Sequence, residues 1–528
     1  MSKRGHGGNA GEGRRGPGEV DQSEVEMGVA GLKFEDDFGD EFEEEVVGEG
    51  DAAQDNAMEE ENEGVQEAQR LFRAGVDELG EDEQLEYDNS AYIMLHQMKV
   101  EYPFLSFDFV RDSLGEQRNK FPKTAFMVGG TQADHSNKHK LMVLKMSDMH
   151  RTRKDRLEDE VSLSDSDDSD DDNDDMDDDA VVEFKSIKHT GAVNRVRSMP
   201  QHPNVVASWS DTGRVYMWDI SRELVTLGAM PAAAAPNAAA LRGSYETLPI
   251  HSFKGHKDEG YALDWSPVKA GRMASGDCKR DIFAWQVTNT GQSVVDETPF
   301  SGHSNSVEDL QWSPTEASVL ASCSVDLSVR IWDLRERKKS MLSVTSAHDA
   351  DVNVISWNKK VPFLIASGGD DGAIKIWDLR MLKRPAGAPA VEPVGHFSWH
   401  KAPVTSLTWH PQDDTVLIAS GADNQITVWD FGLEEDPEEA NKAPKLQDEV
   451  IGGSGEKVEI PPQLLFVHEG QKEIKEVRFH PQIPGMIGST ALEGIHLFIP
   501  EPLDPKMAQK YLATTTPADA PAAPAMNP

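Results

Sequence analysis

Serine, histidine and aspartate recur together in this sequence, and this trio can serve as nucleophile, general base and orienting acid in a hydrolase. Two of the sets are His303, Ser322 and Asp326, and His348, Ser367 and Asp371. A hydrolase needs one exposed nucleophile beside an oxyanion site, but here the set is repeated and nothing singles out one copy. We therefore expect these residues to be structural and the protein to have no enzymatic activity.

An aromatic residue completes each repeated unit at a fixed distance from its histidine. In five units a tryptophan stands 29 residues after the histidine: His189 and Trp218, His256 and Trp285, His303 and Trp332, His348 and Trp377, and His400 and Trp429. A sixth unit opens at His468 and has Phe498 30 residues later. Successive histidines lie 45 to 68 residues apart, so the units are constant while their connections vary. This pattern indicates a repeat architecture.

The histidines do not suggest a metal or cofactor site. They come one per unit, and no Cys/His pair stands at metal-ligand spacing. The sequence has no phosphate-binding loop of the Walker type and no dinucleotide fingerprint, and the glycines at 368–372 fit a hairpin turn. We expect neither a metal nor a cofactor.

Short strands fill each unit. The runs 319–322 and 364–367 are apolar, as in buried strands, and 329–333 and 374–378 alternate between apolar and polar residues. A tight turn at Asp326 or Asp371 separates the two runs. Strands of this length and spacing predict an all-β fold of antiparallel four-stranded sheets.

The run Gly302-His303 to Ile331-Trp332-Asp333, with its sister units, resembles the WD40-repeat family. The resemblance implies a β-propeller in which histidine, Ser or Thr, turn Asp and Trp form a buried relay in each blade. The relay residues would be His303, Ser322, Asp326 and Trp332, then His348, Ser367, Asp371 and Trp377, and also His400, Asp423 and Trp429. Two units depart from the pattern, with Lys279 at the turn position and Glu493-Gly494 without a tryptophan. We expect those two blades to be weaker.

Six units do not close a seven-bladed ring. The segments 123–130 and 139–146 supply a degenerate seventh blade, and the run 104–110 would be the outer strand of the last blade. We expect a seven-bladed propeller over 104–500, closed in this way so that no sheet edge stays exposed.

Two segments outside the repeats resemble the histone-binding WD-repeat chaperones. Residues 85–103 resemble their N-terminal helix, and we expect a helix over 89–101, capped by Asn89 or Ser90. The insertion 432–463 resembles their acidic loop ending in two prolines. The resemblance implies a partner groove between the two, lined by Tyr92, Leu95, Met98, Glu434, Glu435, Asp436, Pro461 and Pro462.

The net charge of −41 is concentrated in segments. Residues 35–63 hold 15 Asp or Glu, and 164–179 hold 11 Asp, without a Lys or Arg in either run. We expect disordered tails over 1–84 and 501–528 and an acidic loop over 157–180. Such a surface repels phosphate backbones and attracts basic proteins, so we expect no direct nucleic-acid binding.

The acidic loop is open to two interpretations. It is either a solvated charged loop between blades or an electrostatic clamp for a basic partner, made by Asp165, Asp167, Asp168, Asp170, Asp171 and Asp172. Ser164, Ser166 and Ser169 are then candidates for phosphorylation, which would add negative charge. The adjacent basic run 151–156 is either a nuclear localisation signal or a patch that folds back on the aspartates.

The remaining composition bears on location. The sequence has only two cysteines and no 18-residue apolar run, so we expect a reducing compartment and no membrane association. The acidic N-terminus and the runs 129–133 and 141–146 are most similar to the glutamate-rich, ribosome-biogenesis branch of the histone-binding group. This resemblance implies a location in the nucleus and nucleolus, and we expect a monomer.

We therefore expect a chaperone or scaffold for basic proteins. The resemblance implies that it escorts a large-subunit ribosomal protein and also binds histones. An alternative function is that of a substrate receptor in a cullin ubiquitin ligase. Arg335 and Arg380, which follow two WD strand ends, would then contact the ligase adaptor.

Overall fold

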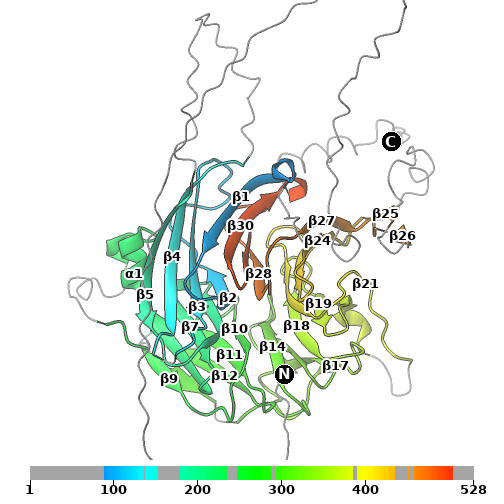
Figure 1. The fold of residues 1–528 in the computed structure, drawn as a ribbon. Coiled ribbons are helices and arrows are strands. Elements are labelled where there is room, and N and C mark those ends of the chain that lie inside the picture. Colours follow the sequence, from blue (N-terminus) through cyan, green and yellow to red (C-terminus); the bar gives the residue numbers. More distant parts are fainter. Residues whose placement is uncertain are drawn as a thin grey trace, which may run out of the picture. The chain divides into compact units, whose positions relative to one another are not determined.

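The computed structural model describes residues 88–135, 137–152, 179–234, 246–287, 293–296, 298–383, 389–433, 450–451, 457–458 and 460–503. The chain divides into two compact units, residues 1–69 and 70–528, and all described residues lie in the second. These residues form a seven-bladed β-propeller, which confirms the predicted fold class (Figure 1). No helix within the described residues is long and apolar enough to cross a membrane.

Each blade is a four-stranded antiparallel sheet whose first strand is the inner one. The first blade contains β2 (Phe104–Phe109), β3 (Lys123–Thr131), β4 (Lys140–Met149) and β5 (Val181–Lys188). The second contains β6 (Val193–Met199), β7 (His202–Ser210), β8 (Arg214–Asp219) and β9 (His251–Phe253). The third contains β10 (Ala262–Trp265), β11 (Arg272–Gly276), β12 (Ile282–Val287) and β13 (Ser293–Val295). The predicted degenerate blade over 123–146 is thus confirmed.

The next three blades follow the same order. The fourth contains β14 (Val307–Trp312), β15 (Val319–Ser324), β16 (Val329–Asp333) and β17 (Leu342–Val344). The fifth contains β18 (Val352–Trp357), β19 (Leu364–Gly369), β20 (Ile374–Asp378) and β21 (Gly395–Phe397). The sixth contains β22 (Val404–Trp409), β23 (Val416–Gly421), β24 (Ile426–Asp430) and β27 (Leu464–His468).

The seventh blade combines both ends of the ring. It contains β28 (Glu476–Phe479), β29 (Ile487–Thr490), β30 (Gly494–Pro500) and, as its outer strand, β1 (Tyr92–Lys99). Figure 1 shows the blue β1 beside the red β30. Outside the blades lie α1 (Ser221–Leu227), the hairpin β25 (Val450–Ile451) and β26 (Lys457–Val458), and short 3-10 turns at Asn89–Ala91, Ala232–Ala234, Leu379–Met381 and Glu501–Leu503.

The predicted helix over 89–101 is wrong. Only Asn89–Ala91 form a 3-10 turn, with the Asp88 carboxylate accepting a hydrogen bond from the Ser90 amide, and Tyr92–Lys99 form β1. A helix here would leave the edge of β30 without a partner, and pairing with that edge outweighs helical spacing. A register shift between Tyr92 and Met94 moves the apolar residues out of strict alternation, which explains why the strand period was hidden.

The prediction of which strand closes the ring was also wrong by one strand. The run 104–109 is not the outer strand of the last blade but β2, the inner strand of the first blade. Its buried face, which includes Phe104 and Phe107, suits this central position. The chain therefore does pair its beginning with its end, through β1 instead of the strand that follows it.

Apolar residues fill the spaces between neighbouring blades, as expected for a propeller that has no single central core. Met94, Phe107, Met127 and Leu497, for example, pack together between the last and the first blade. Each blade therefore depends on both of its neighbours.

Hydrogen bonds also link neighbouring inner strands around the channel. At several junctions a polar side chain of one blade accepts a bond from the main-chain N–H of the next. These bonds run from Val196 to Ser106 (3.1 Å), from Trp312 to Asp264 (2.7 Å), from Trp357 to Gln311 (2.8 Å), from Trp409 to Ser356 (3.0 Å) and from Phe107 to Glu476 (3.0 Å). They satisfy buried polar groups and fix how the blades are set against one another.

Candidate functional site

The buried relay appears in the fourth and fifth blades with the predicted partners. The His303 ring places Nε2 2.6 Å from Ser322 Oγ and Nδ1 2.9 Å from Asp326 Oδ2, and Trp332 donates to the same hydroxyl at 2.8 Å. His348, Ser367, Asp371 and Trp377 repeat this geometry, with distances of 2.7, 2.9 and 2.9 Å. The Ser322 and Ser367 side chains are fully buried, so neither hydroxyl can reach a substrate.

The carboxylates of these relays are strongly held in their charged form. Although burial raises the pKa of Asp371, the hydrogen bond from His348 and its charge bring that pKa down to about 2. Burial lowers the pKa of His303, against the opposing effect of Asp326. The relay therefore fixes a turn to a strand and has no free proton acceptor.

The sixth blade builds its relay with a different hydroxyl. His400 contacts Asp423 at 3.1 Å as predicted, but its Nε2 lies 3.0 Å from Thr427, and Trp429 donates to Thr427 at 2.8 Å. In the fourth blade, Ser322 stands two residues after Leu320, which pairs with Trp332. In the sixth blade, the residue two positions after the partner of Trp429 is Ala419, which has no hydroxyl. Thr427 on the neighbouring strand supplies the missing oxygen.

The third blade does not lack its carboxylate. Lys279 does occupy the turn, but Asp277, two residues earlier, supplies the carboxylate: His256 Nδ1 lies 3.0 Å from Asp277 Oδ2. His256 Nε2 lies 2.7 Å from Ser275 Oγ. Asp277 also accepts bonds from the amides of Lys279 and Asp281. The reason given for a weaker third blade therefore does not hold.

The seventh blade replaces the relay altogether. The Tyr92 hydroxyl lies 2.7 Å from His468 Nδ1, and His468 Nε2 lies 3.2 Å from His496 Nδ1. The His468 ring stacks on Phe498 with centroids 4.3 Å apart. Tyr92 thus belongs to the interior of the closing blade.

This placement changes the predicted partner groove. Tyr92 and Met98 are buried and Leu95 is half-buried, because β1 packs against the neighbouring blades. Pro461 and Pro462 lie just before β27, while Glu434, Glu435 and Asp436 lie outside the described residues. The helix that was predicted to form one side of this groove is therefore replaced by a strand, and the acidic side lies outside the described residues.

The acidic run lies largely outside the described residues. This applies to Ser164, Ser166, Ser169 and the aspartates at 165–172, whereas Asp179 begins the segment leading into β5. The segment before the run is described as far as Thr152, whose amide donates to Ile93 of β1 at 3.1 Å and whose hydroxyl accepts from Leu95 at 2.6 Å. The run is therefore attached beside the closing blade at one end and to the first blade at the other.

A second group of acids, which the sequence interpretation missed, lies on one face of the ring. We call the face where the inner strands begin the upper face. On it, the second to fifth blades carry an acidic arc consisting of Asp211, Asp258, Glu259, Glu308, Asp351 and Asp370. In the sixth and seventh blades the corresponding loops carry Lys401, Lys472 and Lys475, the last paired with Glu473 at 3.1 Å.

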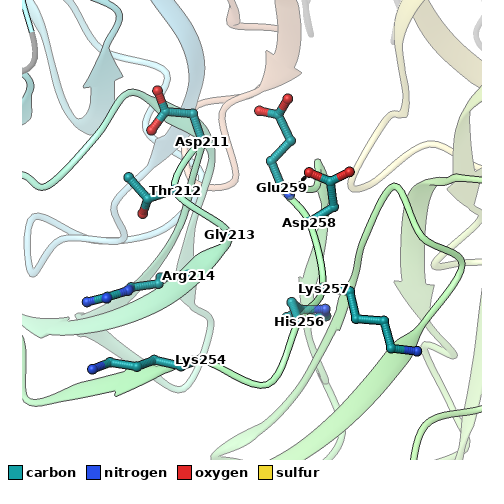
Figure 2. Close-up of a pocket in the computed structure, with 9 residues that line it drawn as sticks. All are labelled: Asp211, Thr212, Gly213, Arg214, Lys254, His256, Lys257, Asp258 and Glu259. Atoms are coloured by element: carbon teal, nitrogen blue, oxygen red, sulfur yellow. Dashed lines mark hydrogen bonds between the residues drawn. The ribbon is translucent and has the colours of Figure 1, made fainter.

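Part of this arc borders a surface pocket of about 380 Å³ between the second and third blades. Figure 2 shows Asp211, Asp258 and Glu259 at one end of the pocket, while the charged groups of Arg214 and Lys254 extend away to one side. Asp258 pairs with Lys279 at 3.1 Å, and Glu259 accepts a bond from Asn194 at 3.0 Å.

The electrostatics of the arc show crowded negative charge. Burial raises the pKa of Glu308, and the negative charge of Asp351 raises it further. Burial likewise raises the pKa of Asp351, and the negative charge of Asp370 adds to this effect. Burial, followed by the negative charge of Glu259, raises the pKa of Tyr261 to about 12. Burial also raises the pKa of Cys278 to about 11, and the charges of Glu308 and Glu259 contribute to this rise. A cation placed among these groups would relieve their mutual repulsion.

One signal in the sequence could have revealed the arc. Glu259 and Asp351 each stand three residues after a repeat histidine, and Glu308 five residues after one. The loop after the histidine opens on the channel, so acids at these offsets gather on one face.

Comparison with known proteins agrees with this geometry. The family described as "WD domain, G-beta repeat" matches residues 295–333, 339–378 and 391–430, which lie in the fourth to sixth blades. The family described as "Histone-binding protein RBBP4", whose description also names the CAF1 complex, matches residues 82–150. That match spans β1 to β4, including the closing strand.

Whole-chain relatives decide the assignment. The chain is 42% identical to "Ribosome assembly protein rrb1" of Schizosaccharomyces pombe over 92% of its own length and 96% of the relative's. It is also 42% identical to "Glutamate-rich WD repeat-containing protein 1" of Dictyostelium discoideum, over 81% and 84% of the two chains. The chain belongs to this family of WD-repeat proteins.

The chain is also similar to two further groups of proteins. "Protein HEAT STRESS TOLERANT DWD 1" of Arabidopsis thaliana is 42% identical over 82% of this chain and 91% of the relative. A more distant similarity, 24% identity over 59% of this chain, is to "Histone acetyltransferase type B subunit 2" of Candida glabrata. The resemblance to the glutamate-rich branch is thus confirmed.

Proposed function

We propose that this protein is a non-catalytic chaperone for basic proteins, acting in the assembly of ribosomes in the nucleus. The acidic arc is the observation that carries the proposal, because its carboxylates are crowded on one face of the propeller. Such a surface favours lysine- and arginine-rich segments. The identity to a protein named for ribosome assembly supports the cellular role.

The cargo of this chaperone is a basic ribosomal protein of the large subunit, with histones as a second class of client. Both classes are cationic, and the match to a histone-binding family supports the second. A basic segment lying across the second to fifth blades would meet Glu259, Glu308 and Asp351, and the lysines of the sixth and seventh blades would limit it to that side. The nucleolus is the location that this cargo implies.

The acidic runs at 35–63 and 164–179 extend the attraction beyond the arc. Single exposed ion pairs contribute only about 0.2–1 kcal/mol, so affinity would come from many of them and fall with salt. Phosphorylation of Ser164, Ser166 or Ser169 would strengthen this effect, since each phosphate adds about −1.5 to −2 charges.

Binding of purified histones and of a purified large-subunit ribosomal protein tests the proposal. The variant E259Q/E308Q/D351N should bind them at least about tenfold more weakly at about 0.15 M salt, where exposed charges are still felt over roughly 8 Å. The control E316Q/E336Q/E392Q removes the same charge from exposed sites away from the arc and should leave binding nearly unchanged.

A second experiment is a pull-down from nuclear extract at a series of salt concentrations. It compares the proteins retained by wild type with those retained by a chain lacking residues 164–179. We expect basic proteins to be retained at low salt, and fewer of them by the deletion. Retention of neutral or acidic proteins, or equal binding by the arc variant, would contradict the proposal. Tighter binding to RNA or DNA than to basic proteins would do so as well.

A ligase-receptor role is the second candidate. Arg335 and Arg380 project from equivalent turns of the fourth and fifth blades, and each is largely exposed while ion-paired to its own Asp333 or Asp378. Arg380 also stacks on Phe363 at 3.6 Å, so both arginines are pre-positioned. Replacing both by alanine should abolish association with a cullin adaptor and leave cargo binding intact, and unchanged adaptor association would dismiss this role.

A further inference from the structure

The half of the central channel away from the acidic arc forms a separate polar cavity. We call the face where the inner strands end the lower face. The cavity there has a volume of about 190 Å³, and five basic and four acidic side chains line it. Those that matter for charge are Asp108, Arg197, Asp264, Lys359, Glu476 and Arg478.

Ion pairs neutralise most of these charges. Arg197 contacts Glu476 at 2.6 Å, Arg195 contacts the same carboxylate at 3.2 Å, and Arg478 contacts Asp108 at 3.1 Å. Arg111, at the mouth, pairs with Glu116 at 2.7 Å. Four of the five basic groups therefore have a carboxylate partner.

Lys359 is the exception. Within the described part of the chain its ammonium makes neither a hydrogen bond nor an ion pair, although it lines the cavity. Its side chain is exposed and borders the cavity together with those of Arg478, Asp264 and Asp108. These residues belong to the seventh, third and first blades, so a fifth-blade lysine that lines the same cavity lies on the channel side of its blade.

The nearby acids do not offset this cation fully. Burial raises the pKa of Asp264 to about 7, and it accepts a hydrogen bond from the Trp312 amide at 2.7 Å. Burial also raises the pKa of Asp309, which accepts from the Ile355 amide at 3.2 Å. Both carboxyls are therefore engaged by main-chain amides of the neighbouring blade. With five basic and four acidic side chains in its lining, the cavity has more basic than acidic groups, although the protein as a whole is strongly acidic.

We propose that this lower cavity binds a small oxyanion of the phosphate type, with the Lys359 ammonium as its direct ion partner and Arg478 beside it. A phosphate group fits a space of this volume. The ligand would contact the fifth and seventh blades together, so that binding also stabilises the closed ring. The acidic arc on the upper face repels anions, so the ligand enters from the lower face.

This proposal does not depend on the chaperone role. Inorganic phosphate is the probe, and equilibrium dialysis with radiolabelled phosphate measures binding to the full chain, with the melting temperature as a second readout. Wild type should bind about one phosphate per chain saturably, and its melting temperature should rise with phosphate at constant ionic strength. Equimolar chloride should give no such rise.

Matched variants locate the site. K359M should weaken phosphate binding at least tenfold, and K359R should retain most of it. K360M removes the same charge from the neighbouring lysine, which is also exposed but does not line the cavity, and should match wild type. The melting temperatures without phosphate verify that each variant is folded. Absence of saturable binding to wild type, or equal binding by wild type and folded K359M, would overturn the proposal.

Discussion

Arg197 on the inner strand of the second blade contacts Glu476 on the inner strand of the seventh at 2.6 Å, reaching past the first blade that lies between them. Glu476 also accepts from the Phe107 amide and the Ser106 hydroxyl of that first blade, at 3.0 and 2.7 Å. One buried carboxylate therefore joins three blades at the seam where the ring closes.

The first prediction concerns this carboxylate. E476Q leaves Arg197 and Arg195 without their charge partner in the interior, and breaking a buried pair costs about 3–5 kcal/mol. We expect a loss of this size in the free energy of unfolding, measured by urea denaturation. E473Q, at an exposed position, should change it by less than about 0.5 kcal/mol. Similar losses for both variants would show that the seam carries no special stability.

The second prediction is the response of Glu476 to acid. Burial alone would raise its pKa, but Arg197, Arg195 and Arg478 bring it down to about 2, below the value of about 4.3 for an unfolded chain. The stabilisation is therefore present above pH 4.3 and is lost as the pH falls toward 2. Unfolding free energies between pH 5 and pH 2 should decline less steeply for E476Q than for wild type.

The third prediction concerns the buried histidines. Burial lowers the pKa of His496 to about 4, from about 6.5 when unfolded, so the unfolded chain takes up its proton first. Stability should then be full above pH 6.5 and fall as the pH decreases to 4, by on the order of 3 kcal/mol for one such group. Urea titrations across this range should show a shallower slope for H496Q. The exposed variant H202Q should keep the wild-type slope.

The fourth prediction compares two positions in the third blade. D277A removes the carboxylate that holds His256 and two turn amides, and leaving buried groups unpaired costs about 1–3 kcal/mol. K279A at the turn itself should cost less than about 0.5 kcal/mol. Chemical denaturation distinguishes the two, and a larger effect at Lys279 would mean that the turn position, and not Asp277, holds this blade together.

The fifth prediction is a trade between stability and binding. Glu308 has a raised pKa from burial, and Asp351 adds to it, so its charge at pH 7 opposes folding. E308Q should therefore raise the melting temperature while weakening the binding of basic proteins. A lower melting temperature together with unchanged binding would mean that this carboxylate serves only the fold.

The sequence determines the repeating part of the fold well. The fixed spacing from His303 to Trp332 and from His348 to Trp377 reflects a hydrogen-bonded unit, so one pattern identified several blades and their relays. Where other residues fill the same role, as Thr427 and Asp277 do, the spacing changes and the sequence alone was not sufficient.

The closing strand could not be recognised in the same way. Tyr92–Lys99 lie about 400 residues from their partner β30, and no local pattern reports so distant a pairing. The acidic arc was missed for a related reason, since Glu259, Glu308 and Asp351 are far apart in sequence and meet only when the blades close into a ring. The long acidic runs account for much of the net charge, whereas single acids in short loops change the composition too little to be noticed.

The pairing of β1 with β30 has a consequence for biosynthesis. β1 is made early, whereas β30 spans Gly494–Pro500 near the end of the chain. At a translation rate of about 5–20 residues per second, β1 waits roughly 20–80 seconds for its partner strand. During that interval an open crescent with unpaired strand edges sits on the ribosome, which makes this a molecule whose own maturation calls for protection.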